Sequence, residues 1–350
     1  MSSIKEVARE AGVSTATVSH VVNGTRFVSD EVRARVMAAV EKCRYYPNAQ
    51  ARSLASGKSR IIGLVISDIA NPFFPELVKA IESAAFEKGY DVMLANTNYN
   101  TERTAHYVRR FFERKVAGVA IMTSEMEQDL IDELEQKEIP TVFLDVGHAG
   151  MHMNNLRVGY DEGIRQAIQH LAELGHRRIA FISGPTNLRS ARRRLEAYRG
   201  IMSKLFPDQP ELIFHGNFRV AGGRAAAAEI MRLKGEGFPT AVMAGNDLMA
   251  IGAISEFESE GVGVPDDVSV VGFDDIAFAA VTRPPLTTVH LPLDDLGRRA
   301  VDVLLKSLED IKKEGIEIHI QTELVIRDST GRAPDRRTKR QAKQFEKHVV

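Results

Sequence analysis

The feature that most constrains this chain is an alternation of two patterns between residues 61 and 330. Short, continuous apolar runs recur there, separated by longer stretches in which apolar residues repeat with a helical period. The runs span residues 61–66, 90–95, 116–122, 141–146, 178–183, 212–216, 240–245 and 268–273. Continuous apolar runs are typical of strands covered on both faces, and their alternation with amphipathic helices is typical of parallel α/β sheets.

Eight strand–helix units are too many for one compact half. We therefore expect two similar lobes of roughly four or five strands each, built on doubly wound parallel sheets. Sheets of this kind bind ligands at the carboxyl ends of their strands, so the residues that follow each run are the candidates for a binding site.

Aromatic and polar residues follow six of these runs. Aromatic rings can cover the apolar face of a sugar, and Asp, Asn and Arg can hold its hydroxyls by charge-assisted hydrogen bonds. In the alternative interpretation the phenylalanines are core and the polar residues cap helices, which we consider at least as good for Asp247 and Asp275. Another cluster, Arg189 to Arg199, is interpreted as a solvated helix face with only Arg194 turned inward.

The first 47 residues carry signals for three short helices joined by tight turns. Ser3 and Glu6 form a capping box at the start of the first helix, which Gly12 ends. Ser14 can cap a second helix that ends at Gly24, and a third amphipathic stretch follows. This order of caps and turns predicts a helix-turn-helix domain.

The polar side of the second helix carries short donors and acceptors with almost no acidic residue. Such side chains can approach base edges and phosphates in a major groove. Residues 1–60 hold ten Lys and Arg against five Asp and Glu, whereas residues 61–330 are net acidic. A small helical bundle without a ligand is the alternative, but the basic head favours DNA. The candidate DNA-binding side chains are Thr15, Ala16, Thr17, Ser19, His20, Asn23 and Arg26.

The chain resembles the LacI/GalR family of bacterial repressors in this region. The resemblance is carried by IKEVA at residues 4–8, AGVSTATVSHVVN at 11–23 and TRFV at 25–28, the last being closest to the ribose- and purine-repressor branch. It implies that Thr15, Ala16 and His20 read bases and that Arg26 lies near the DNA. Ala16 stands where several relatives carry a hydroxyl or an amide, a departure that bears on base choice.

Residues 48–60 follow as a linker. Composition alone predicts a flexible segment, because the stretch is too short to be a stable helix by itself. The resemblance implies instead a hinge helix that folds on DNA, pairs across a dimer axis and inserts Leu54 as a wedge into the minor groove.

For residues 61–330 the resemblance implies a two-lobed periplasmic-binding-protein-like core that binds an effector and forms the dimer. It implies effector contacts at Asn71, Phe73, Phe74, Asp145, Ser190, Arg194, Phe218, Asn246 and Asp274. Purine-binding relatives carry an arginine at the position of Leu188 and lack the asparagine at 246. Ribose-binding relatives differ at Val146 and Leu291. These departures argue against a purine and weaken the case for ribose, and they favour a sugar or sugar-like polyol whose identity stays open.

The sequence thus predicts a sequence-specific transcriptional repressor, a homodimer that binds a palindromic operator in double-stranded DNA and is controlled by a sugar-like effector. The alternatives are a purine- or phosphosugar-responsive regulator, or a sugar-binding module or enzyme with an accessory basic domain. We expect no enzymatic activity, cofactor or metal, because HExxH, CxxC, GxSxG and Walker signatures are absent and His148 and His152 lack a third ligand nearby.

We expect the protein to reside in the cytoplasm. No apolar run approaches the ~20 residues that a bilayer span needs. The single cysteine, Cys43, cannot form an internal disulfide, and the first residues lack a signal-peptide core. Residues 331–350 are basic without leucine heptads, which predicts a disordered tail rather than a tetramerising helix.

Overall fold

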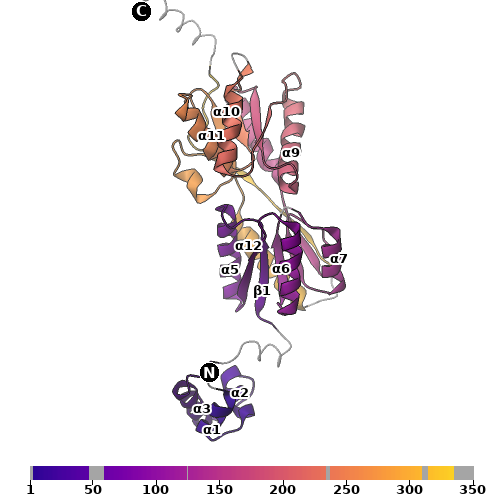
Figure 1. Cartoon of the computed structure of the whole chain (residues 1–350), viewed down its shortest axis with the longest axis vertical. Helices are drawn as coiled ribbons and strands as arrows, with labels where there is room; N and C mark the ends of the chain where they lie inside the picture. Colours follow the sequence, from indigo (N-terminus) through magenta and orange to yellow (C-terminus); the bar gives the residue numbers. More distant parts are fainter. Residues whose placement is uncertain (1–2, 47–58, 124, 234–236, 310–313, 335–350) are drawn as a thin grey trace, which may run out of the picture. The chain divides into compact units, whose positions relative to one another are not determined.

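The computed structural model of the chain describes residues 3–46, 59–123, 125–233, 237–309 and 314–334. It divides into two compact units, Met1–Arg60 and Ile61–Val350 (Figure 1). None of the helices in these described parts is both long and apolar enough to cross a membrane.

The first unit is the three-helix domain that the caps predict. It contains α1 (Ile4–Ala11), α2 (Thr15–Asn23) and α3 (Asp30–Lys42). The Ser3–Glu6 capping box is formed, and the Ser14 hydroxyl accepts from the Thr17 amide at 3.1 Å. Gly12 and Gly24 end their helices in the left-handed region, where a glycine avoids steric strain. Val7, Val18 and Val36 are fully buried where the three helices meet.

The second unit consists of two lobes, each built on a six-stranded sheet. The first lobe contains β1 (Ile61–Ile66), α5 (Phe73–Glu87), β2 (Asp91–Asn96), α6 (Thr101–Glu113), β3 (Gly118–Met122), α7 (Gln128–Gln136), β4 (Thr141–Leu144), β5 (Met153–Val158), α12 (Leu293–Glu309) and β11 (Glu317–Ile320). The second contains α8 (Tyr160–Glu173), β6 (Ile179–Ser183), α9 (Arg189–Leu205), β7 (Ile213–His215), α10 (Val220–Met231), β8 (Ala241–Ala244), α11 (Asp247–Ser259), β9 (Ser269–Asp274), the short η2 (Ala277–Ala280), β10 (Thr287–His290) and β12 (Glu323–Val325).

The two sheets repeat one topology. Their orders are β11-β5-β4-β3-β1-β2 and β12-β10-β9-β8-β6-β7, and every pairing is parallel except β10 with β12. Helices α5 and α12 cover one face of the first sheet, and α6 and α7 cover the other. In the second lobe α8 and α9 cover one face, and α10 and α11 the opposite face.

The expectation of four or five strands per lobe was too low. The strands absent from the sequence prediction are β5, β10, β11 and β12. They read MNNLRV, TTVH, EIHI and ELV, so they lack the continuous apolar runs by which the other strands were predicted. β11 and β12 are edge strands, which have a neighbour on one side only.

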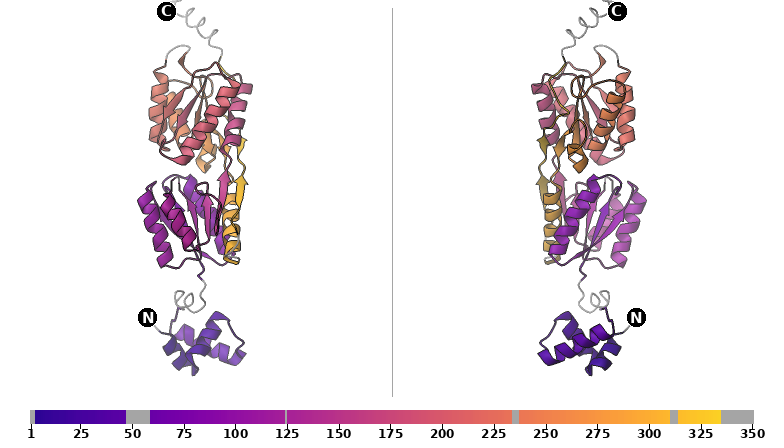
Figure 2. Two further views of the ribbon diagram at one scale, coloured as in Figure 1. Left: turned by 90° about the vertical axis from the view of Figure 1, so that its right-hand side faces the viewer. Right: turned by 90° about the vertical axis from the view of Figure 1, so that its left-hand side faces the viewer.

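The chain crosses between the lobes three times, after β5, after β10 and after β11. The crossings run close together along one edge of the unit (Figure 2). The Thr322 hydroxyl donates to the Gly159 carbonyl at 2.7 Å, and the Gly159 amide donates to the Ile320 carbonyl at 2.9 Å. A Cβ on Gly163 would lie 2.3 Å from Val289, so the crossings are packed without spare volume.

Candidate functional site

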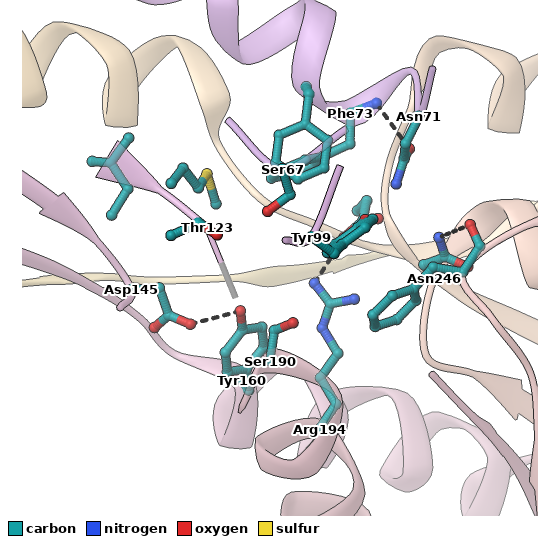
Figure 3. A pocket seen from close by; sticks show the side chains of 15 residues that line it. Ser67, Asn71, Phe73, Tyr99, Thr123, Asp145, Tyr160, Ser190, Arg194 and Asn246 are labelled. Atoms are coloured by element: carbon teal, nitrogen blue, oxygen red, sulfur yellow. Dashed lines mark hydrogen bonds and ion pairs between the residues drawn. The ribbon is translucent and has the colours of Figure 1, made fainter. Parts of the chain in front are cut away.

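A pocket lies where the carboxyl ends of strands from both lobes meet (Figure 3). The space between its walls, including the part open to solvent, has a volume of about 480 Å³. Its lining is Ser67, Asn71, Phe73, Phe74, Tyr99, Met122, Thr123, Leu144, Asp145, Tyr160, Ser190, Arg194, Phe218, Asn246 and Asp274. The structure therefore brings together all nine residues that the sequence suggested as effector contacts.

Two of the predicted asparagines shape the backbone around the pocket. The Asn71 side chain accepts from the Phe73 amide at 3.2 Å, where α5 begins. Asn246 caps α11, with its side-chain oxygen 3.0 Å from the Met249 amide, and its side-chain NH₂ donates to the Phe218 carbonyl at 3.2 Å. Asn246 thus orders two loops of the pocket wall at once.

The expectation that Asp247 and Asp275 cap helices is wrong. Asp247 is fully buried and accepts hydrogen bonds from the Ile276 amide and the Thr288 hydroxyl, so it ties the loop after β9 to β10. Burial, reinforced by the nearby Asp274, holds the pKa of Asp247 well above its usual range. Asp275 instead pairs with Arg327 at 2.7 Å and with His290 at 2.9 Å.

Several lining residues adopt a backbone conformation that L-residues rarely take. The φ angles are 59° at Tyr99, 71° at Asp145, 59° at Phe218 and 114° at Asp274. Such conformations persist only where the surrounding structure enforces them, and they concentrate at binding and active sites.

Arg194 projects from α9 into the centre of the lining, with Asp145, Tyr160 and Ser190 on one side of it and Asn246 on the other (Figure 3). Its guanidinium donates to Asp274 at 3.0 Å and lies 4.3 Å from the Phe273 ring centroid and 5.0 Å from that of Tyr160. Its Nε atom is buried and has no hydrogen-bond partner among the described residues. The ion pair and the rings fix the guanidinium at the centre of the lining.

The charges of this pair are set by competing effects. Burial alone would lower the pKa of Arg194, but Asp274 and further nearby groups raise it overall. Burial raises the pKa of Asp274 to about 6, although the Arg194 charge and hydrogen bond act in the opposite direction.

Asp145 links the two lobes at the opposite side of the pocket. It accepts from the Tyr160 hydroxyl at 2.8 Å and the Val158 amide at 3.0 Å, and it forms an ion pair with Arg193. The interpretation that only Arg194 of the arginine cluster turns inward is therefore wrong, since Arg193 is mostly buried as well. The helical period of α9 alone could not predict that Asp145, a carboxylate of the other lobe, faces Arg193.

Sequence reasoning missed six lining residues, namely Ser67, Tyr99, Met122, Thr123, Leu144 and Tyr160. Four of them, Ser67, Met122, Thr123 and Leu144, end or directly follow a strand, a position that would have suggested them. Ser67 is fully buried, and its hydroxyl has no hydrogen-bond partner among the described residues. Burial raises the pKa of Tyr99, which keeps its phenol neutral.

The histidine pair considered as a metal site is not brought together with further ligands. His148 is exposed and His152 is buried. Across the residues that the structure describes, no group of three or more His, Cys, Asp or Glu side chains is placed to hold a metal ion.

The polar side of α2 forms a second candidate site, in the first unit. Thr15, Ala16, Asn23 and Arg26 are exposed, and Thr17, Ser19 and His20 are half-buried. Three side-chain pairs order this surface: Ser14 with Thr17 at 2.9 Å, Ser19 with Asn23 at 3.1 Å, and His20 with Thr25 at 2.9 Å. The eighth candidate, Leu54, lies outside the described residues.

Comparisons with known proteins agree with both parts. Residues 3–48 match the model "Bacterial regulatory proteins, lacI family", and residues 168–330 match "Periplasmic binding protein-like domain". The chain is 35% identical to the HTH-type transcriptional repressor PurR of Aliivibrio salmonicida over 331 residues, which are 94% of this chain and 99% of that protein.

Solved structures extend the likeness to the whole architecture. A lac repressor dimer bound to operator and the anti-inducer ONPF superposes with a TM-score of 0.85 at 32% identity, covering 94% of this chain and 99% of the other. A complex of the transcriptional regulator CelR with cellobiose gives a TM-score of 0.68 at 29% identity, with 94% and 100% covered.

Proposed function

Because the chain belongs to the LacI family of bacterial regulatory proteins, we propose that it is a transcriptional repressor whose operator affinity is set by a small polyol bound in the pocket. The observation that carries this proposal is that the nine residues implied as effector contacts by the family resemblance all line one pocket, in the same chain as a helix-turn-helix domain. The DNA-reading surface is the polar side of α2, from Thr15 to Arg26.

A homodimer on a palindromic operator is the assembly we propose. A two-fold dimer presents two identical reading helices, which match the two half-sites of an inverted repeat. The lac repressor structure to which this chain is similar is a dimer bound to operator. Operator affinity is then expected to fall steeply as salt is added, because each phosphate contact releases counterions. Sedimentation of a tetramer would contradict the dimer.

The charges around the pocket favour a neutral, hydroxyl-rich effector over a phosphosugar. The charged lining residues are Asp145, Asp274 and Arg194, and each already has an ionic partner. A phosphate group would enter next to two carboxylates without an unengaged cation among the lining residues. A polyol, by contrast, carries no charge, so its hydroxyls can donate to and accept from the polar lining side chains without separating these ion pairs.

A purine is the second candidate effector, because the chain is similar along most of its length to repressors named PurR. Against it stands the position where the resemblance implies a purine-contacting arginine. That position is Leu188, which is buried and apolar and can donate no hydrogen bond to a base.

The role of the pocket is binding rather than catalysis. Its carboxylates are engaged by arginines, and an acid–base pair needs at least one group that is free to exchange a proton with a substrate. Effector and operator binding must be coupled reciprocally, so an effector that weakens operator binding is itself bound more weakly by the operator complex.

One experiment tests the proposal on the full chain. A panel of monosaccharides, sugar alcohols, phosphosugars and purine bases is screened for an increase in thermal unfolding temperature. In parallel, the chain selects duplexes from a randomised library with and without each stabilising compound. We expect selection of an inverted repeat and stabilisation by a neutral polyol. Failure to enrich any inverted repeat under all conditions would exclude the repressor function.

A further inference from the structure

The three side-chain pairs on the polar side of α2 are of two kinds. Ser14–Thr17 and Ser19–Asn23 join residues three and four positions apart, as neighbours on a helix surface do. The partner of His20 is Thr25, which lies beyond the end of the helix. This third pair therefore depends on the path of the chain after the helix.

That path is set by the way α2 ends. Gly24 adopts a φ of 62°, and its amide donates to the His20 carbonyl. The Thr25 amide donates to the same carbonyl at 3.3 Å. The chain is thus folded back over the last turn of the helix, which brings the Thr25 hydroxyl to 2.9 Å from Nδ1 of His20.

Among the described residues, none of the other helical neighbours of His20 makes a side-chain hydrogen bond to its ring. Ala16, four residues earlier, has only a methyl group. Thr17, three residues earlier, is paired with Ser14, and Asn23, three residues later, is paired with Ser19. Thr25 is therefore the polar side chain on which the orientation of the imidazole depends.

We propose that Thr25 is a positioning residue for DNA recognition, which holds His20 so that Nε2 faces a base edge. This inference rests on the proposed function of α2 as the DNA-reading helix. A hydrogen bond at Nδ1 restricts rotation of the imidazole ring and leaves Nε2, on the other side of the ring, to face a base. His20 then arrives at the groove already ordered, which reduces the loss of side-chain freedom on binding and sharpens the choice of base.

The test compares Thr25→Val, which keeps the shape but removes the hydroxyl, with Thr25→Ser, which keeps the hydroxyl. The probe is the inverted-repeat duplex that the parent protein selects from a randomised library, together with duplexes in which one base pair of each half-site is changed. The full chain is used throughout. Because Thr25 is exposed, both variants are expected to fold, which circular dichroism checks.

We expect Thr25→Val to lower discrimination at a single base-pair position of each half-site by about tenfold, within the range of one base-edge contact. Discrimination elsewhere and the salt dependence are expected to stay as in the parent, and Thr25→Ser to restore the parent behaviour. In the free protein, NMR couplings of the His20 side chain are expected to show one dominant rotamer in the parent and in Thr25→Ser, and an average over several rotamers in Thr25→Val.

His20→Ala and the double variant with Thr25→Val complete a double-mutant cycle. His20→Ala is expected to relax the same base-pair position, and adding Thr25→Val to it is expected to change nothing further there. Additive losses would overturn the inference, as would unchanged discrimination in Thr25→Val. If Thr25→Val lowered the affinity for all duplexes equally and made that affinity less dependent on salt, Thr25 would be a phosphate contact. This result would also overturn the inference. If the parent selects no duplex, it is the proposed function that fails.

Discussion

The polar surface of α2 and the polar lining of the pocket are held in place over very different distances along the chain. On α2 each side-chain pair joins residues three to five positions apart, and the pairs are solvent-exposed. In the pocket, Arg194 pairs with Asp274 across 80 positions and Arg193 with Asp145 across 48, in buried or partly buried surroundings.

This difference teaches that the two sites respond to mutation in different ways. A local, exposed pair can be changed with little effect on the unfolding free energy, so the α2 surface can alter its specificity without loss of fold. A buried charge separated from its partner is costly, so changes in the pocket alter ligand binding and stability together.

Arg194→Ala should give the largest effect. It leaves the buried Asp274 without its cation, which is expected to lower the unfolding free energy by about 3–5 kcal/mol. Ligand binding is expected to be lost, while the affinity of the folded protein for the selected duplex is retained. Chemical denaturation, calorimetry with the stabilising compound and duplex titration measure the three quantities.

Arg199→Ala is the matched control on the same helix. Arg199 pairs with Glu211 at the surface, where both side chains are half exposed, so its loss is expected to cost at most about 1 kcal/mol. Equal destabilisation by the two variants would break the distinction between buried and exposed pairs. Unchanged ligand affinity in Arg194→Ala would refute its role in the pocket.

The raised pKa of Asp274 predicts a pH dependence of stability. Between its unfolded value near 3.8 and its folded value of about 6, the folded state binds more protons than the unfolded state. The contribution of Asp274 to the unfolding free energy therefore decreases as the pH rises through this window, by no more than about 3 kcal/mol.

Asp274→Asn removes this titration. The difference in unfolding free energy between parent and variant, measured at intervals from pH 4 to pH 7, should decline with rising pH and then level off. A difference that stays constant over this range would contradict the proton uptake assigned to Asp274.

The helix caps Ser14, on α2, and Asn246, in the pocket, permit a direct comparison of an exposed cap with a buried one. Ser14→Ala removes an exposed cap of α2 and should cost about 1 kcal/mol, measured by hydrogen exchange of the α2 amides. Asn246→Ala also leaves the buried Phe218 carbonyl without its donor, so we expect about 2–3 kcal/mol together with weaker ligand binding. Equal costs for the two caps would show that burial adds nothing at Asn246.

Leu54→Ala is expected to affect duplex binding alone. The proposed loss of a minor-groove wedge is expected to weaken binding of the selected duplex about tenfold, equivalent to about 1.4 kcal/mol, while ligand binding is unchanged. Leu205→Ala, which alters a half-exposed leucine at the end of α9, is the control. If Leu54→Ala bound the duplex as tightly as the parent does, the proposed insertion of Leu54 into the minor groove would be wrong.

The sequence predicted most accurately those features that depend on neighbours within one helix or one strand. The caps Ser3 and Ser14 and the helix ends at Gly12 and Gly24 are as predicted, because each depends on hydrogen bonds or backbone conformation within a few residues. Each of the eight apolar runs overlaps a strand. For the buried strands, such as β3 and β8, the reason is that a parallel strand covered on both faces requires apolar residues on both.

The errors concern residues whose surroundings come from elsewhere in the chain. β5 is rich in polar residues, yet it is a strand because β4 and β11 pair with it on both sides. Arg193 looked like a surface residue until Asp145, 48 positions away, was found opposite it. Tyr99 follows a strand like the predicted contacts do, but only the fold turns its ring into the pocket lining.

The sequence by itself determined the helix-turn-helix head, the alternation of strands and helices, and the chemical types of residue at the strand ends. Hydrophobic periodicity, capping and turn chemistry are local, so they can be read along the chain. Tertiary structure alone decided which of those strand ends face one another, which charges are paired and which polar atoms remain available to a ligand. These properties depend on contacts between segments that are far apart in the sequence. Such segments come close only when both sheets have formed and the three crossings hold the two lobes together.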